Sequence, residues 1–302
     1  MHRFLKNILR FSCIIIVLLG LTEAAMRMLP SAYADKDRNL RARSAEIATL
    51  ILGSSHTYYG LNPKEMGDSV FNLANVSQSP EYDLALLLHY DSLMPNLRRI
   101  IVPISYFTYR DPSLEEGPEW QRAIPYKAEM HLPLHHDLSI YNLELADFER
   151  VRGRLSNLVL RKLSNTCDSL GMGLGFDLAH RDIRWQEGGQ ARAAKHSPEA
   201  PEGRYDAVTA TLRQLIGHAR TRGCEVVLIT TPTWPTYHCN LNAYQEAEMR
   251  QGIADLLSDD PVRYYDFMRD TRFTDEDFYD TDHLSDIGAR KLSRILADTL
   301  GI

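Results

Sequence analysis

Two short stretches, far apart in the chain, carry the residue types of a serine nucleophile and its base. GSSH, residues 53–56, follows an apolar run, and DTDH, residues 280–283, lies near the C-terminus. A serine hydroxyl is a weak nucleophile unless an imidazole within hydrogen-bond reach accepts its proton and a carboxylate orients that imidazole. The spacing of Asp280 and His283 lets the carboxylate hold one ring nitrogen while the other faces a serine of the first stretch. The two stretches therefore predict a catalytic relay of a serine, His283 and Asp280.

The first stretch also has a simpler interpretation, and two neighbouring residues are weighed as alternatives. Gly and Ser are common turn formers, so residues 53–55 could be a tight turn and no more. His56 is the immediate neighbour of Ser55, and adjacent side chains rarely point the same way, so we interpret His56 as cleft lining or a packed histidine. Asp282 is the second choice for the acid, because on most turns it points away from His283. The joint placement of the two stretches favours the relay.

Alternating strands and helices define where these stretches lie. Apolar runs predict five strands, at Ile47–Gly53, Ser69–Ala74, Arg98–Ser105, Cys224–Pro232 and Val262–Phe267. Helices are expected from Ser79, from Tyr205, from Asn242 to about Leu257, and over the last residues of the chain. This alternation predicts an α/β fold, a three-layer flavodoxin-like sandwich around a mainly parallel five-stranded sheet. Ligands bind beyond the carboxyl ends of such strands, where Ser55 lies.

The N-terminus resembles a targeting segment. Basic residues precede the apolar run from Phe11 to Leu21, as in a secretory signal or a membrane anchor. Cleavage after Ala34 and an uncleaved anchor both remain open, and in both cases the basic end stays cytoplasmic while the rest is exported. We therefore expect residues 1–34 to be a signal-anchor or signal peptide and 35–302 to be the α/β domain. Within that domain, about 110–203 is expected to be an insertion that shapes the cleft.

The composition excludes some classes of protein. A net charge of −6 and the lack of a Lys/Arg cluster argue against nucleic-acid binding. The four cysteines contain no Cys-x-x-Cys pair, so no zinc or redox signature is present. Cys224 and Cys239 flank a predicted strand and its exit loop, which leaves a disulfide open.

Several other motifs have bland interpretations. HLPLHHD (131–137) lacks helical spacing and is expected to be a loop and not a metal site, and the helical segment Leu143–Leu163 belongs to the insertion. The acidic run 275–277 lacks the glycine and spacing of a calcium loop. GMGLG (171–175) has no preceding strand and resembles a phosphate cradle only superficially. Four aromatic residues at strand exits are open to sugar stacking or to core packing: Tyr58, Tyr59, Trp234 and Tyr237.

LGSS after the first strand and DTDH before the last helix together resemble the SGNH/GDSL hydrolase superfamily. NLAN (72–75) resembles its second block, and the order of elements is similar over about 47–109 and 205–302. The resemblance implies Ser55 as nucleophile, Asp280 as acid and His283 as base. The N-terminal anchor is similar to the exported branch of teichoic-acid D-alanyl transfer (DltD-like) and alginate acetylation proteins, whose members act on acyl groups of envelope polymers.

The chain departs from the superfamily at three positions. Ser54 stands where the Asp of the Gly-Asp-Ser block is expected, Ala74 replaces the second-block glycine, and VPISYF offers Ser105 in place of the third-block asparagine. The resemblance therefore implies an oxyanion hole made by the backbone amides of Ser55 and Ala74. The Asn75 or Ser105 side chain is a further candidate donor.

The leading hypothesis is an extracytoplasmic, membrane-tethered serine esterase or O-acyltransferase acting on acylated envelope polysaccharides or other esters, in the periplasm or at the cell surface. It needs no metal and no organic cofactor. A membrane-bound acyltransferase is a candidate partner. The alternative is a non-catalytic SGNH-like envelope protein that binds a glycan or partners a membrane acyltransferase, and the missing third-block asparagine favours this alternative.

Overall fold

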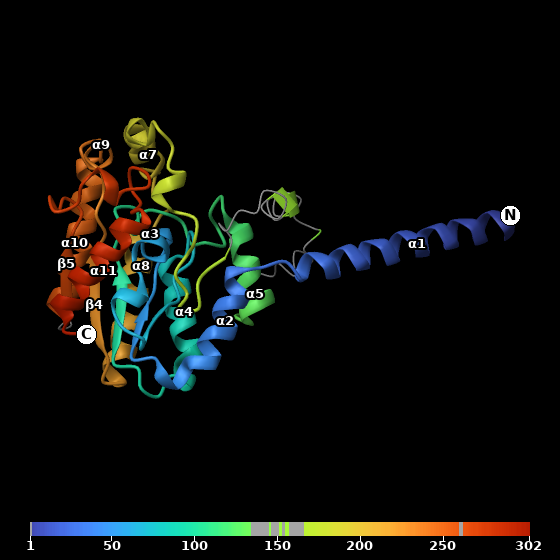
Figure 1. Cartoon of the computed structure of the whole chain (residues 1–302), viewed down its shortest axis with the longest axis horizontal. Helices are drawn as coiled ribbons and strands as arrows, with labels where there is room; N and C mark the ends of the chain where they lie inside the picture. Colours follow the sequence, from blue (N-terminus) through green and yellow to red (C-terminus); the bar gives the residue numbers. More distant parts are fainter. Residues whose placement is uncertain (1, 134–144, 146–150, 153–154, 157–165, 260–261) are drawn as a thin grey trace.

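The computed structural model describes residues 2–133, 145, 151–152, 155–156, 166–259 and 262–302 (Figure 1). Among these residues, five strands form one sheet in the order β2-β1-β3-β4-β5, and every neighbouring pair is parallel. The strands are β1 (Thr49–Ile51), β2 (Val70–Asn72), β3 (Arg99–Pro103), β4 (Glu225–Thr230) and β5 (Arg263–Asp266). This is the flavodoxin-like order, in which the chain places β2 on one side of β1 and the later strands on the other. The predicted α/β fold is confirmed.

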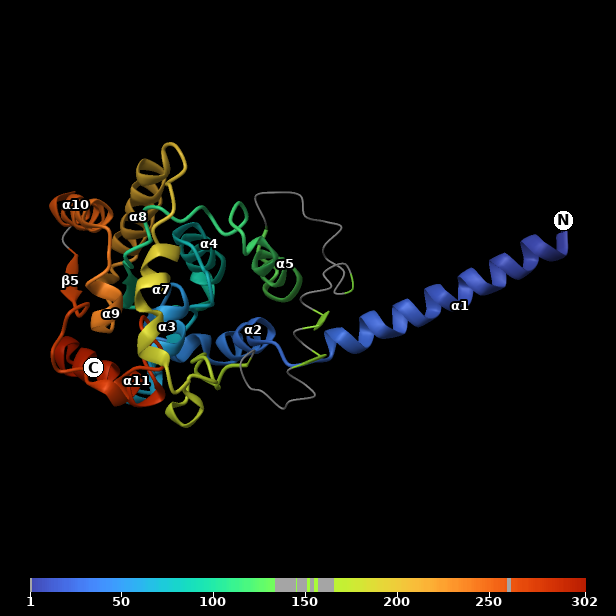
Figure 2. The same ribbon diagram turned by 90° about the horizontal axis from the view of Figure 1, so that it is seen from above.

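Helices connect and cover the strands. The α-helices are α1 (His2–Arg27), α2 (Ala32–Arg43), α3 (Ser55–Gly60), α4 (Pro80–Tyr90), α5 (Ile124–Met130), α7 (Gly189–Lys195), α8 (Arg204–Thr221), α9 (Pro235–His238), α10 (Ala243–Asp259) and α11 (Asp286–Leu300). Short 3₁₀ helices are η1 (Ser44–Glu46), η2 (Pro63–Glu65), η3 (Asp91–Leu93), η4 (Trp120–Ala123), η7 (Leu178–His180), η8 (Trp185–Gly188) and η9 (Asp275–Asp277). Seen from above, α4, α8 and α10 lie on one side of the sheet and α11 on the other (Figure 2).

The two faces of the sheet bury two separate cores because successive side chains of a strand alternate between faces. Leu50 and Leu228 pack with α4, α8 and α10, whereas Ile51 and Ile229 pack with α11. The central strands are buried on both faces, which explains why they read as apolar runs in the sequence. The sheet is thus a rigid middle layer, and its carboxyl edge is a fixed platform for loops.

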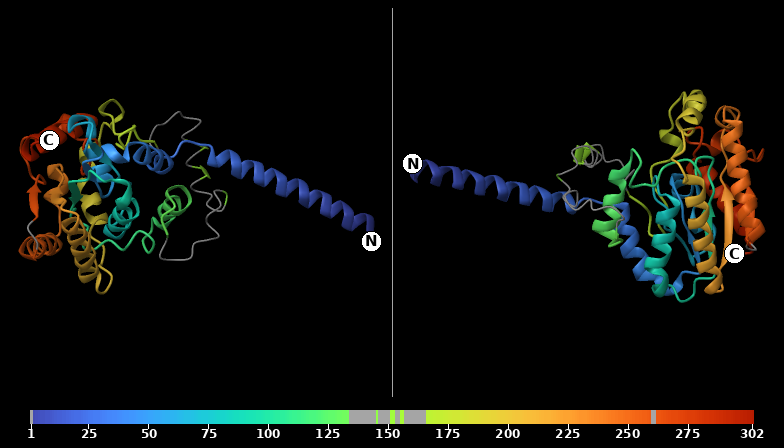
Figure 3. Two further views of the ribbon diagram at one scale, coloured as in Figure 1. Left: turned by 90° about the horizontal axis from the view of Figure 1, so that it is seen from below. Right: turned by 180° about the vertical axis from the view of Figure 1, so that it is seen from behind.

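The charged stretch after the N-terminal segment is part of the domain. The structure shows helix α2 here, and this helix lies beside α5 (Figure 3). Leu40 and Lys36 of this helix are fully buried. Because charged residues are abundant throughout α2, its narrow buried face cannot be recognised by sequence inspection.

Helix α1 projects away from the domain (Figures 1 and 2). Its segment Arg3–Arg27 is long and apolar enough to cross a membrane, and most of its large apolar side chains are exposed. A 25-residue helix spans about 38 Å, enough for the roughly 30 Å of a bilayer core. The boundary at residue 34 remains a prediction.

Several smaller expectations are settled by the structure. The cysteines are free: Cys224 is buried, with its thiol directed at the carbonyl oxygen of Leu97, and Cys239 is exposed, so the two form no disulfide. GMGLG is a loop whose Gly171 packs against the end of β2, where a Cβ atom would lie 2.0 Å from the Asn72 carbonyl oxygen. Most of HLPLHHD and of the helix expected at Leu143–Leu163 lies outside the described residues.

Candidate active site

The turn after β1 presents a hydroxyl group at the carboxyl edge of the sheet. Gly53 has φ +108°, and a Cβ atom there would lie 2.0 Å from Cγ of Pro103 on β3, so only glycine fits. The Gly53 N–H donates to Asp83 Oδ1 at 2.8 Å, which ties the turn to α4. Helix α3 begins two residues later, at Ser55. The Gly-Ser-Ser stretch is therefore a tight turn, and it leads directly into the serine predicted to be the nucleophile.

Ser55, His283 and Asp280 meet although 228 residues separate the first two. Ser55 Oγ lies 2.8 Å from His283 Nε2, and His283 Nδ1 lies 2.9 and 3.0 Å from the two carboxylate oxygens of Asp280. Asp280 Oδ1 also accepts the backbone N–H groups of Asp282 and His283, which fixes the loop before α11. A carboxylate on Nδ1 favours the tautomer protonated there, so Nε2 accepts the Ser55 proton.

The surroundings of His283 favour its positive charge. Burial acts to lower the pKa of this imidazole, but the carboxylates of Asp280 and Asp282 outweigh burial, and the pKa is raised above its ordinary value. The side chain is only 4% exposed. The imidazolium that forms when His283 takes the Ser55 proton is therefore stabilised by its surroundings.

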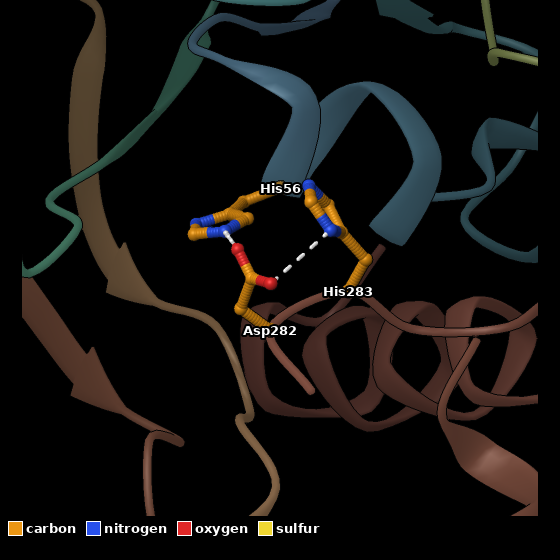
Figure 4. Close-up of side chains that lie close together, drawn as sticks. All are labelled: His56, Asp282 and His283. Atoms are coloured by element: carbon orange, nitrogen blue, oxygen red, sulfur yellow. Dashed lines mark hydrogen bonds and ion pairs between the residues drawn. The ribbon is translucent and has the colours of Figure 1, made fainter. Parts of the chain in front are cut away.

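A second histidine beside the serine has a different environment. His56 Nε2 lies 3.2 Å from Asp282 Oδ2 (Figure 4), and His56 Nδ1 lies 3.0 Å from Ser105 Oγ. Burial lowers the pKa of His56, so the ring is neutral, and its one proton belongs on the nitrogen that faces the carboxylate. His56 Nδ1 therefore accepts the hydroxyl proton of Ser105. Both ring nitrogens are occupied, in keeping with the prediction of a packed histidine.

This hydrogen bond corrects the role expected for Ser105. Ser105 lines the cleft, as an oxyanion donor would, but its single hydroxyl proton is directed at His56. Toward the cleft the oxygen offers only lone pairs, which would repel an oxyanion. The third-block position thus supports His56 in this structure.

The cluster of His56, Asp282 and His283 resembles a metal site in composition. One ligand atom from each lies within 4.8 Å of the others, and all three residues are buried. However, the Arg192 Nε atom lies 2.9 and 3.0 Å from the two carboxylate oxygens of Asp282. A guanidinium in this position already supplies the positive charge and would repel a metal ion. We interpret the cluster as a hydrogen-bonded network.

The residues expected to complete the oxyanion hole from the second block do not reach the cleft. The Ala74 N–H donates to Asn72 Oδ1 at 3.0 Å, and the Ala74 carbonyl accepts from the Lys36 ammonium group. The Asn75 N–H donates to the Gly53 carbonyl at 3.1 Å, and the Asn75 side chain is 1% exposed. Neither Ala74 nor Asn75 belongs to the cleft lining. The prediction that placed them there is not supported.

Ser77, which the sequence analysis missed, lies on the cleft instead. Its backbone has φ 60°, a conformation that non-glycine residues rarely adopt, and its hydroxyl donates to Glu119. Within the described part of the chain, the N–H groups of Ser77 and of Ser55, the first residue of α3, donate to no other protein group. The residue type does not reveal that Ser77 adopts a positive φ. Only the mostly polar character of residues 75–79 could have pointed to Ser77 from the sequence.

The cleft in front of Ser55 has a volume of about 670 Å³. Beside the relay, the ring of Phe176 stacks between those of Tyr59 and Tyr279, with centroids 3.7 and 4.3 Å away, and meets His283 edge-on at 5.2 Å. Tyr59 and Phe176 line the cleft. Of the other aromatic residues considered for sugar stacking, Tyr58 and Tyr237 are buried, and Trp234 packs against Trp185.

The cleft lining also carries charges of both signs. Its cationic residues are Arg122, Arg192, Lys195 and Arg204, and its acidic residues include Asp83, Asp111 and Glu119. Burial raises the pKa of Asp83 and that of Asp111 to about 7. Residues between 110 and 203 supply much of the cleft lining, and their assignment as an insertion stays a prediction.

Comparison with known proteins gives the following. No protein-family model matches the chain, and no curated protein matches it. Among solved structures it is similar to a protein described as lipolytic, of the G-D-S-L family, from Desulfitobacterium hafniense (12% identity, 83% of this chain and 98% of the other, TM-score 0.41). It is also similar to a protein described as an acylhydrolase from Bacteroides fragilis (8%, 84% and 87%, 0.40) and to one described as a platelet activating factor from Streptococcus pneumonia (16%, 94% and 99%, 0.41). We therefore base the function on the geometry of the site.

Proposed function

We propose that this protein is a serine esterase or O-acyltransferase that acts on ester-linked acyl groups of envelope glycans from the extracytoplasmic side of a membrane. The observation that carries this proposal is the continuous relay from Ser55 Oγ through both nitrogens of His283 to Asp280, with Ser55 on a cleft. Hydrogen-bond distances throughout the relay meet the requirement for a nucleophile, a base and an orienting acid.

The first half of the reaction acylates Ser55. His283 Nε2 takes the hydroxyl proton while Ser55 Oγ bonds to the ester carbonyl carbon, and Asp280 stabilises the imidazolium that forms. The N–H groups of Ser55 and Ser77 are the donors we assign to the resulting oxyanion, and the N-terminus of α3 adds to this stabilisation. When the carbon–oxygen bond to the leaving alcohol breaks, that oxygen takes the proton from His283 Nε2.

The second half releases the acyl group. Water, in an esterase, or a sugar hydroxyl, in a transferase, gives its proton to His283 Nε2 and bonds to the acyl carbon. The bond from this carbon to Ser55 Oγ then breaks, and Ser55 regains the proton. Both outcomes use the same residues and differ in the acceptor that the cleft admits.

The cleft lining supports the proposed substrate class, and the N-terminal helix supports the proposed location. The charged and polar groups that line the cleft suit the many hydroxyl groups of a glycan. The apolar helix α1 would hold the domain at a membrane, with its basic end toward the cytoplasm. A membrane-bound acyltransferase that delivers the acyl group is the partner we propose for the transferase case.

The test is covalent labelling of the full-length chain with a fluorophosphonate probe, which reacts with activated serines. We expect labelling of wild type, none of Ser55→Ala, and retained labelling of Ser54→Ala, the matched control in which the neighbouring hydroxyl is removed. Ser54 is buried and its hydroxyl has no hydrogen-bond partner among the described residues. Absence of labelling in folded wild-type protein would favour the non-catalytic envelope protein instead.

A further inference from the structure

A second carboxylate faces the imidazole of His283. Asp282 Oδ1 lies 3.6 Å from His283 Nδ1, too far for a hydrogen bond but within ion-pair distance (Figure 4). The nearer carboxylate, Asp280, is 36% exposed, whereas Asp282 is 1% exposed. Water screens an exposed charge far more than a buried one. The more distant carboxylate is therefore the one whose field reaches His283 with the least screening.

Asp282 is held in place by groups from three separate parts of the chain. His56, on α3, approaches one oxygen at 3.2 Å and is itself fixed by Ser105, after β3. Arg192, on α7, contacts both oxygens through Nε, at 2.9 and 3.0 Å. A buried carboxylate stays ionised only when it is paired and hydrogen-bonded in this way. The triad chemistry by itself requires none of these contacts.

We propose that Asp282 is a positioning residue that strengthens His283 as a base, and that Arg192 moderates this effect by partly neutralising Asp282. The inference rests on the proposed function for its catalytic meaning. Asp282 acts through His283 and touches no substrate. Arg192 also lines the cleft, so a residue of the cleft wall adjusts the basicity of the catalytic histidine.

The charges around His283 determine the direction of each effect. The titratable or charged groups that face it are Asp280, Asp282 and Tyr279 from its own loop, His56 and Tyr59 from α3, and Arg192 and His196 from α7 and its C-terminal end. Burial lowers the pKa of His283, both carboxylates raise it, and Arg192 lowers it. Burial also lowers the pKa values of His56 and His196, and that of His196 falls to about 3, so neither ring adds a positive charge near neutral pH.

The experiment measures the titration of His283 in two variants that should move it in opposite directions. In Asp282→Asn, which keeps the shape and removes the charge, we expect the pKa of His283 to fall by about one unit. In Arg192→Met, which removes the neighbouring cation while Asp282 keeps its contacts with His56 and His283, we expect it to rise. Asp298→Asn, which removes an exposed carboxylate on α11, is the control and should leave the value unchanged.

Two readouts separate failure of this inference from failure of the proposed function. NMR titration of the His283 Cε1 proton in the full-length chain, assigned with His283→Gln, needs no activity. The acid limb of the pH profile of kcat/KM for p-nitrophenyl acetate reports the same group in the free enzyme. Opposite shifts in both readouts support the proposal. Opposite NMR shifts without any esterase activity would retain the effect of Asp282 and reject the enzyme.

A purely structural role for Asp282 predicts a different result. Both variants would then lower activity or stability without moving the titration of His283, or would move it in the same direction, and either result would overturn the proposal. If Asp282→Asn does not fold, Arg192→Met alone decides, because the Arg192 side chain is one-third exposed and the Asp282 carboxylate keeps its contacts with His56 and His283 in that variant. An unchanged or lower pKa in that variant is the contrary outcome.

Discussion

Replacing Lys36 by methionine should make the protein more stable near neutral pH, although it removes a charged side chain that donates a hydrogen bond. Lys36 lies on α2 with no exposed surface, its ammonium group donates to the Ala74 carbonyl, and it stands 4.3 Å from the centroid of the Tyr58 ring. No carboxylate among the described residues lies within ion-pair distance of it. Burial lowers its pKa from 10.5 to about 7.

The magnitude of the effect is obtained from this shift. The difference between 10.5 and about 7 is 3.5 units, which at about 1.4 kcal/mol per unit corresponds to about 5 kcal/mol. Below pH 7 Lys36 is charged in both the folded and the unfolded state, so the full destabilisation is present. Between pH 7 and 10.5 the unfolded state binds the additional proton, and stability therefore rises with pH.

The substitution also removes favourable contacts. The thioether of the introduced methionine cannot donate to the Ala74 carbonyl, and leaving that buried oxygen unpaired costs about 1–2 kcal/mol. The net expectation at pH 6 is a gain of about 3 kcal/mol in the free energy of unfolding, or about 6 °C in Tm. Near pH 10.5 the burial cost of the wild-type lysine has vanished, and Lys36→Met should be slightly less stable than wild type.

The assay is thermal unfolding of the full-length chain in mild detergent, followed by circular dichroism between pH 6 and 10. The informative quantity is the difference in Tm between wild type and Lys36→Met, which should shrink and change sign as the pH rises. Lys64→Met, at a lysine that is 58% exposed and paired with Asp168, is the control and should show no such crossing. Parallel curves for wild type and Lys36→Met would refute the reasoning.

Two further substitutions test the relay and the turn that carries Ser55. Asp280→Asn should lower kcat/KM for p-nitrophenyl acetate by about 10²–10³. This loss is smaller than the roughly 10⁴ seen when a triad has one acid, because Asp282 remains 3.6 Å from His283. An unchanged rate would remove Asp280 from the relay. Gly53→Ala should lower the free energy of unfolding by about 2–4 kcal/mol, from backbone strain plus the clash with Pro103. Gly67→Ala has a similar φ, +116°, and open space around it, so it should show the strain alone, and equal effects at the two glycines would contradict the clash.

The sheet and the meeting of the relay residues could be predicted from the sequence because both depend on patterns along the chain. Apolar runs between turn-forming residues marked all five strands, and the ends of parallel strands meet at one edge of a sheet. Ser55 follows the first strand, and His283 precedes the last helix, which covers a face of the sheet to which β1 contributes, so the two meet at the carboxyl edge. No detail of the side-chain packing was needed.

The parts that could not be predicted depend on backbone direction and on packing between segments without a pattern. Ala74 and Ser77 lie three residues apart in one loop, and only the path of the loop decides which of them borders the cleft. Burial of Lys36 follows from how α2 packs, although its residue type favours the surface. Arg192 comes from a segment whose polar composition gave no sign of its contact with Asp282.

The two histidines beside Ser55 show why the environment, and not sequence distance, selects the base. His56 is adjacent to the serine in the chain, but Asp282 and Ser105 occupy both of its nitrogens, and burial lowers its pKa. His283 is 228 residues away, yet its Nε2 faces Ser55 and two carboxylates raise its pKa. Groups of one type whose surroundings push their pKa values apart take different roles. A base must accept a proton and then hold it, and of these two rings only that of His283 has both a free lone pair toward Ser55 and the charge to stabilise the product.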